Sequence, residues 1–360
     1  MSPSPSGAPP VGAQSYSFAT TSEGWTFANP SPFSTVTGAY SGATTTLDQT
    51  TSDNTNSFAY WESPVSSLAN GTTGASSLYR TTFTVKSNLA DLATVPAIRI
   101  RSSSLNFEQS DSLVISSAGD GEVSPPIGGR TYSQFFSQPS GVTQFRLDLD
   151  VLNFDPTDAA NATLSLDNVV VEALALPGEN TGQVIASYDF ATDGPGTFTP
   201  RDASPTLTRP EQYTFSNGLS IRGTTNLTSS NDTIFGFWGA ETLTPMFGNA
   251  FYALTFTVRS TATDVDANKA QIPVFRFRVN DSTLKVAAVL NIDSRDGMGR
   301  LPVGNAQESY TLYFQPPLES TGSTFVISFD YLYAPEAADN PNIAVILDTL
   351  TIRQYLAPGF

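Results

Sequence analysis

A repeated sequence constrains the fold of this chain more than any other feature. SYSFAT at residues 15–20 reappears as SYDFAT at residues 187–192, with five of six positions identical. Further matched blocks follow in the same order: FAYW ending at Trp61 and FGFW ending at Trp238, YRTTFTVKS (79–87) and YALTFTVRS (252–260), VPAIRIR (95–101) and IPVFRFR (272–278). Offsets between matched residues drift only between 172 and 181, which indicates a tandem duplication with insertions in the loops.

The matched blocks are short and alternate between apolar and polar residues. Ile98 and Ile100 share one side of their run, while Arg99 and Arg101 share the other. Alternation with a period of two places apolar side chains on one face of a strand. Turn signals separate the blocks, and no stretch has the periodicity of an amphipathic helix. We therefore predict an all-β chain made of two tandem antiparallel β-sandwiches of the jelly-roll type.

The duplication also predicts the domain boundaries. A chain of 360 residues is long enough for two domains. Pro177 and Gly178 interrupt the last block of the first copy. We expect an extended N-terminal tail at residues 1–14, the first sandwich at 15–176, a linker at 177–184 and the second sandwich at 185–360.

Composition excludes several classes of function. The formal net charge is −16, which argues against a nucleic-acid partner because phosphate binding requires basic patches. The chain has no Cys and no His, so thiol chemistry, imidazole catalysis and His- or Cys-ligated metals are excluded. No apolar run is long enough to span a membrane. Asp148 and Asp150 lie on one strand face rather than opposed across a cleft, so we expect no glycosidase activity and no enzyme.

Three sequence blocks in each copy carry a resemblance to a known group of domains. They are an opening SYSF or SYDF followed by EGWTF (23–27) or GTFT (196–199), a central YRTTFTV or YALTFTV, and a closing LDNVVV or LDTLTI. This arrangement resembles the jelly-roll domains of carbohydrate-binding modules and galactose-binding-like modules of bacterial extracellular proteins. The resemblance covers nearly the whole chain outside the N-terminal tail, and it implies an extracellular or cell-surface location and a polysaccharide ligand.

Tryptophan and arginine residues are the candidates for sugar binding. Trp61 and Trp238 occupy matched positions, and an aromatic ring can stack on a pyranose; their retention in both copies favours core packing instead. Two arginine pairs project from one face of their strands and can line a ligand-binding face, since guanidinium groups bind oxygen ligands in forked geometry. The alternative is cross-strand ion pairing with strand carboxylates. The pairs are Arg99 with Arg101 and Arg276 with Arg278, and the carboxylates are Asp148, Asp150 and Asp330.

Asp167 and Asp348 occupy equivalent places in the closing blocks. In the resembled modules a structural calcium often sits there, bound by this Asp together with oxygens of the opening strand. Those modules usually place an acidic residue just after the opening Phe, whereas this chain has Ala19 and Ala191. Each predicted calcium site therefore lacks one carboxylate, and the alternative role of each Asp is bonding to a turn at the strand edge.

The ends of the chain suggest an assembly. ALPG (175–178) follows the first closing block and LAPG (356–359) follows the second. The two chain ends therefore look like two halves of one domain junction. We expect a non-catalytic structural subunit of an extracellular fibre or surface layer, built head to tail, with Val11 of the tail docking near Tyr355, Leu356 and Phe360 of a neighbouring copy. The alternative is a carbohydrate-binding protein with two binding modules.

Overall fold

The structure is a computed structural model. It describes residues 13–29, 36–51, 58–68, 77–104, 109–115, 124–138, 144–152, 159–174, 182–202, 212–215, 217–222, 234–245, 250–261, 274–281, 286–292, 306–316, 324–333 and 344–356. Nearly all of these residues lie in antiparallel strands or the turns between them, with a single 3₁₀ turn at Leu92–Thr94 among the described residues. The all-β prediction is therefore confirmed.

The described residues of the first copy form eleven strands. They are β1 (Ala13–Tyr16), β2 (Thr26–Ala28), β3 (Thr37–Ser41), β4 (Thr46–Thr50), β5 (Phe58–Glu62), β6 (Ser77–Ser87), β7 (Ala97–Ser104), β8 (Gln109–Ile115), β9 (Arg130–Gln138), β10 (Phe145–Leu152) and β11 (Thr163–Leu174). β1 pairs with β11 of its own copy, with Ala13 opposite Glu172. Ala13 and Gln14, which we assigned to the docking tail, are therefore part of the first copy's own sheet.

The described residues of the second copy form eleven strands in the same order. They are β12 (Gln183–Asp189), β13 (Thr199–Asp202), β14 (Gln212–Phe215), β15 (Leu219–Arg222), β16 (Ile234–Pro245), β17 (Ala250–Ser260), β18 (Val274–Asp281), β19 (Val286–Ile292), β20 (Glu308–Phe314), β21 (Thr324–Tyr333) and β22 (Ala344–Leu356). β12 begins inside the linker that we predicted at 177–184, and most of that linker lies outside the described residues. The domain boundaries stay a prediction.

Each copy has one sheet of its own. In the first copy the strand order is β3-β4-β11-β6-β9, with β1 also pairing with β11. In the second copy the order is β14-β15-β22-β17-β20, with β12 pairing with β22. Adding eleven to each strand number of the first sheet reproduces the second. The duplication seen in the sequence is thus a duplication of topology, strand for strand.

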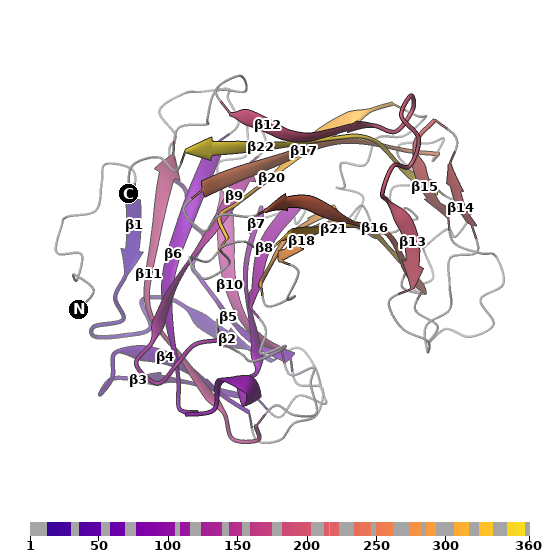
Figure 1. Cartoon of the computed structure of the whole chain (residues 1–360). Coiled ribbons are helices and arrows are strands. Elements are labelled where there is room, and N and C mark those ends of the chain that lie inside the picture. Colours follow the sequence, from indigo (N-terminus) through magenta and orange to yellow (C-terminus); the bar gives the residue numbers. More distant parts are fainter. Residues whose placement is uncertain are drawn as a thin grey trace.

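The other layer of both copies is one continuous sheet of ten strands. Its order is β13-β16-β21-β18-β19-β8-β7-β10-β5-β2, and it runs along the inner side of the bend in Figure 1, with the two copy-specific sheets outside it. β8 and β19 are equivalent strands, and they pair with each other antiparallel. The sequence predicted two tandem sandwiches joined at a linker, and the structure joins them through this sheet as well: edge strands carry unpaired N–H and C=O groups, and here each copy satisfies those of the other.

The junction between the copies has an approximate two-fold symmetry. Ser112 of β8 lies opposite Val289 of β19, and these two residues are themselves equivalent (289 − 112 = 177). A pairing in which equivalent residues face each other is isologous, as in a symmetric dimer. The duplication therefore produces a dimer-like pair within one chain rather than a head-to-tail repeat.

A separate apolar cluster covers the junction from the side of the copy-specific sheets. Phe135 packs on Phe251 with ring centroids 4.7 Å apart, and Phe251 stacks on Tyr313 at 5.7 Å. Besides Ala253, the cluster consists of three equivalent pairs of side chains: Leu78 and Phe251, Phe135 and Tyr313, Leu174 and Tyr355. The two copies thus adhere through backbone pairing on one layer and through side chains on the other.

The repeated opening sequence supplies the same aromatic contacts to each core. Tyr16 meets Trp25 edge to face with centroids 5.5 Å apart, and Tyr188 meets Phe198 in the same way at 5.5 Å. Phe18 and Phe190 are fully buried. Edge-to-face packing is a favourable arrangement for aromatic rings. SYSF and SYDF therefore recur because each copy needs the same aromatic packing between its two layers.

A candidate binding face on the shared sheet

The two matched tryptophans are core residues. Each is 5% exposed, and each indole donates Nε1–H to a backbone carbonyl, Trp61 to Asp48 and Trp238 to Ser220, at 3.1 Å in both cases. Neither presents a ring face to solvent. This confirms the core-packing interpretation of Trp61 and Trp238 and corrects their alternative assignment as sugar-stacking residues, because their rings are enclosed between the layers and their N–H groups are already bonded.

The two candidate calcium ligands are bound by basic side chains. Lys86 Nζ lies 2.6 Å from Asp167 Oδ2. In the second copy, Arg259 Nε donates to both oxygens of Asp348 at 3.0 and 3.1 Å, and Gln307 donates a third bond. Lys86 and Arg259 are themselves equivalent (259 − 86 = 173). A basic side chain thus forms an ion pair with each carboxylate. Among the described residues, no group of three acidic residues suited to a metal occurs. The calcium prediction gains no support.

Of the residues predicted to dock on a neighbouring copy, only some lie in the part of the chain that the structure describes. Tyr355 is buried in the cluster between the copies, against Phe251. Its ring is therefore not available to a neighbouring chain. Val11 and Phe360 lie outside the described residues, and Leu356 ends β22. Among the described residues nothing supports a filament contact.

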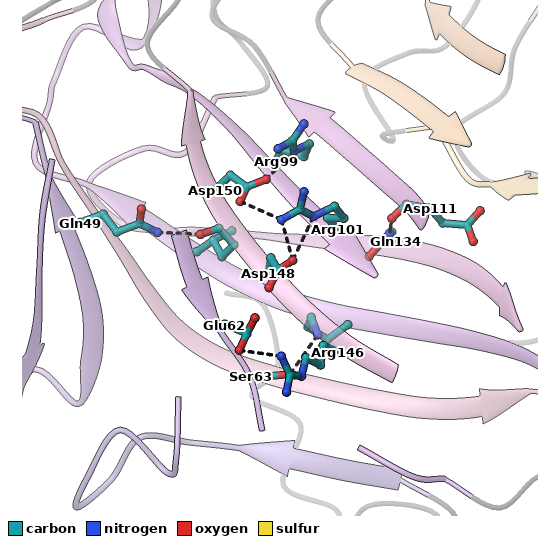
Figure 2. Close-up of polar contacts among 12 residues, drawn as sticks. Gln49, Glu62, Ser63, Arg99, Arg101, Asp111, Gln134, Arg146, Asp148 and Asp150 are labelled. Atoms are coloured by element: carbon teal, nitrogen blue, oxygen red, sulfur yellow. Dashed lines mark hydrogen bonds and ion pairs between the residues drawn. The ribbon is translucent and has the colours of Figure 1, made fainter. Parts of the chain in front are cut away.

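The arginine pair of the first copy lies on the face of the shared sheet that points away from the core. Arg99 Nε lies 2.5 Å from Asp150 Oδ2, and Arg101 binds Asp148 Oδ2 through Nε at 2.9 Å and Nη2 at 2.7 Å. Figure 2 shows Arg101 between the two carboxylates. Asp148 and Asp150 are almost completely covered, whereas both guanidinium groups keep some contact with solvent. The cross-strand ion-pair interpretation is confirmed.

Two residues that sequence analysis missed complete this face, and both come from β5. Tyr60 lies opposite Asp150 in register and is half-buried, with the Arg101 guanidinium carbon 5.7 Å from the centre of its ring. Glu62 lies opposite Asp148 and binds Arg146 at 3.0 Å. The signal was present in FAYWE, where Tyr60 and Glu62 alternate with Ala59 and Trp61, which point into the core. We define the copy 1 face as Tyr60, Glu62, Arg99, Arg101, Asp148 and Asp150.

The equivalent face of the second copy is poorer in polar groups. Arg276 and Arg278 both bind Asp330 Oδ2 through Nε at 2.6 Å, and Arg278 Nη2 binds Oδ1 at 3.1 Å. Register places Ser328 where the first copy has Asp148, Phe237 where it has Tyr60, and Gly239 where it has Glu62. The Asp330 carboxylate thus forms ion pairs with the guanidinium groups of both arginines. We define the copy 2 face as Arg276, Arg278, Ser328 and Asp330.

Burial sets the electrostatics of both faces. It raises the pKa of Asp148 to about 6, because removal from water outweighs the attraction of Arg101, and the charges of Asp150 and Glu62 raise it further. Burial also lowers the pKa of Arg276, which Asp330 opposes and the like charges of Arg278 and Arg99 reinforce. Among these causes, the influence of Arg99 is the smallest, and it reaches Arg276 across the junction.

Comparison with known proteins gives similarities of structure only. Neither a protein-family model nor a curated protein sequence matches the chain. A tandem CBM22-1–CBM22-2 domain of Xyn10C from Paenibacillus barcinonensis is similar over 98% of this chain and 100% of that one, at 14% identity and a TM-score of 0.30. The CBM1 domain of BiXyn10A is similar over 48% of this chain and 98% of that one, at 12% identity and a TM-score of 0.30. At this identity and TM-score the similarities say nothing about what this chain binds.

The described residues contain no helix that is long and apolar enough to cross a membrane.

Proposed function

We propose that the chain is an extracellular polysaccharide-binding protein and that the copy 1 face is its binding site. The observation that carries the proposal is the setting of Tyr60. A half-buried aromatic ring lies among charged side chains that are held by ion pairs on the sheet. Sugars are bound by such combinations, since an aromatic ring contacts the C–H surface of a pyranose while fixed polar groups bond its hydroxyls.

The fixed geometry of the polar groups supports this proposal. Arg101 is oriented by two contacts to Asp148, and Arg99 by one to Asp150. Both carboxylates are buried under the guanidinium groups, so the arginine side chains have lost most of their freedom before any ligand arrives. Sites built on strands hold their groups more precisely than sites on loops. Preorganisation of this kind lowers the entropic cost of binding a flexible chain of sugars.

The second copy supplies a natural comparison. Its equivalent positions carry Phe237, Gly239 and Ser328 in place of Tyr60, Glu62 and Asp148. The copy 2 face thus offers fewer hydrogen-bonding groups to a ligand. We expect one binding site for each chain, in the first copy, with the second copy extending and bracing the sheet.

Binding is tested with Tyr60→Ala and a matched Tyr60→Phe. Affinity electrophoresis and calorimetry would use soluble xylan, hydroxyethyl cellulose, galactomannan and polygalacturonate as probes. We expect Tyr60→Ala to weaken binding of at least one neutral polysaccharide about tenfold or more, while Tyr60→Phe, which keeps the ring, loses about fivefold or less. Absence of binding to every probe, or equal binding by Tyr60→Ala and the wild type, would refute the assignment.

The fibre hypothesis is the second candidate and has less to recommend it. The junction between copies is isologous, and closed contacts of this kind end an assembly rather than propagate it. Analytical ultracentrifugation at high concentration separates the two functions. We expect a single species that does not grow with concentration; long polymers would favour the fibre instead.

A further inference from the structure

The copy 1 face contains one guanidinium group with two carboxylates within reach. Arg101 binds Asp148 Oδ2 at 2.7 Å through Nη2, and the same nitrogen lies only 3.9 Å from Asp150 Oδ1. Oδ1 of Asp148 and Oδ1 of Asp150 are both buried and accept no hydrogen bond from the protein. Asp150 Oδ1 is therefore a buried hydrogen-bond acceptor close to Arg101. A small rotation of the Arg101 side chain would supply its missing hydrogen bond.

The second copy displays the alternative arrangement. Arg278 is the equivalent of Arg101 (278 − 101 = 177), and Ser328 replaces Asp148. With no carboxylate at that position, Arg278 binds Asp330, the equivalent of Asp150, through both Nε and Nη2. In the same register of the same sheet, the equivalent arginine therefore binds the equivalent of Asp150 when the position of Asp148 carries no charge.

We propose that Arg101 has two positions: ionised Asp148 holds it in the first, and it moves onto Asp150, opposite Tyr60, when Asp148 becomes neutral, so that the copy 1 face responds to pH while the copy 2 face does not. Asp148 is then a positioning residue that acts through Arg101. The proposal about Arg101 stands on the comparison of the two copies; its consequence for sugar affinity rests on the proposed function.

The groups around Asp148 make the switch possible at a mildly acidic pH. Arg101 faces Asp148 from β7, Glu62 and Tyr60 from β5, and Asp150 from its own strand, where Arg146 also lies two residues away. Arg101 favours the ionised form of Asp148, whereas Glu62, Asp150 and burial favour the neutral form, which raises its pKa to about 6. Asp150 keeps the bond from Arg99, so it remains a suitable acceptor when Asp148 is protonated.

Movement of Arg101 changes the surface that a sugar would meet. The guanidinium carbon lies 5.7 Å from the ring centre of Tyr60, within the range of a cation–π contact. While Arg101 is there, it competes with a pyranose for that ring. Tyr60 lies opposite Asp150 in register, so transfer to Asp150 brings the guanidinium group further over the ring. Acidification from pH 7.5 to pH 5 should therefore weaken sugar binding by about two- to fivefold, the factor expected for one exposed cation–π contact.

The test follows Arg101 directly, by NMR of its Nε–H and of the Tyr60 ring protons between pH 4.5 and 8. We expect both signals of the wild type to shift with a common midpoint near pH 6. Asp148→Ser, which installs the residue of the second copy, should show neither shift and should hold both signals at their low-pH positions. Glu62→Gln is the control for a titration that belongs to Glu62, and it should keep the step.

The outcomes separate this inference from the proposed function. A step at Arg101 in the wild type that Asp148→Ser abolishes upholds the switch, even if no polysaccharide binds. Signals of Arg101 that stay constant across the pH range, or a step that persists in Asp148→Ser, would overturn it. If Asp148→Ser fails to fold, Ser328→Asp provides the reciprocal test, because it should create a new step at Arg278.

Discussion

The two copies have the same strands in the same order, yet they fill their interiors differently. Thr81, Ser102, Asp111 and Gln134 are buried between the layers of the first copy, and Ser102 donates to Gln134 Oε1 at 2.9 Å while Gln134 donates to the Asp111 carbonyl at 2.7 Å. Their equivalents in the second copy are all apolar and lie in its core: Leu254, Val279, Ala288 and Leu312. The fold therefore requires the alternation of faces but not a uniformly apolar interior.

Buried polar groups are costly unless their hydrogen bonds are made. In the first copy, Gln134 uses both ends of its amide to connect the two layers. Gln49 also connects the two layers, through its Nε2 alone, which donates to the Leu149 carbonyl, and its equivalent is Ile221. The first copy thus fixes the position of its layers by hydrogen bonds where the second copy uses apolar contact. The copy with the more polar core also carries the more polar face.

The largest effect is expected at the contact between the copies. Phe251→Ala removes a buried ring that packs on Phe135, Tyr313 and Tyr355, and it should lower the free energy of unfolding by about 3–5 kcal/mol. Leu78→Ala, at the equivalent position, should cost about 2–4 kcal/mol, since a smaller side chain is lost. Urea unfolding measures both. A loss below about 1 kcal/mol in both variants would show that the junction does not depend on this cluster.

The second prediction exchanges core residues between the copies. Leu312→Gln places an amide in an apolar core with no partner, so we expect a loss of about 3 kcal/mol. The reverse change, Gln134→Leu together with Ser102→Val, removes both side chains of one hydrogen bond and the bond from Gln134 to the Asp111 carbonyl, and should cost about 1 kcal/mol. Differential scanning calorimetry compares the pair. Equal losses in both directions would mean that the polar residues of the first copy have no special packing.

Much of this architecture is predictable from the sequence, and what is not has a physical reason. Alternation in IRIR and FRFR predicts strands with arginine on one face, and the repeat predicts that the faces are equivalent. Pairing of β8 with β19 was not predictable, because the sequences of these strands say which face is apolar but not which edge each strand meets. Alternation in FAYWE places Tyr60 and Glu62 on the outward face, but their position beside Asp150 and Asp148 depends on the register of β5 against β10, which the sequence does not specify.

The third prediction concerns the pH dependence of stability in the first copy. Asp148 has its pKa raised in the folded chain from 3.8 to about 6, so the folded state binds more protons than the unfolded state between these pH values. The stability of the wild type should therefore fall as pH rises from 4 to 7, by roughly 3 kcal/mol relative to Asp148→Ser, since each pKa unit corresponds to about 1.4 kcal/mol. Urea unfolding at several pH values measures this difference. Parallel profiles for wild type and variant would contradict it.

The smallest effects separate the two equivalent ion pairs of the closing strands. The side chains of Lys86 and Asp167 are 36% and 29% exposed, so solvent screens their pair and Asp167→Asn should cost less than about 1 kcal/mol. Arg259 and Asp348 are only 18% and 5% exposed, and Asp348→Asn leaves a covered guanidinium without its carboxylate, for an expected loss of about 2 kcal/mol. Because a basic side chain already neutralises each carboxylate, calcium and chelator should leave the melting temperature of the wild type unchanged. A calcium-dependent rise that Asp348→Asn abolishes would instead restore the calcium site that the sequence suggested.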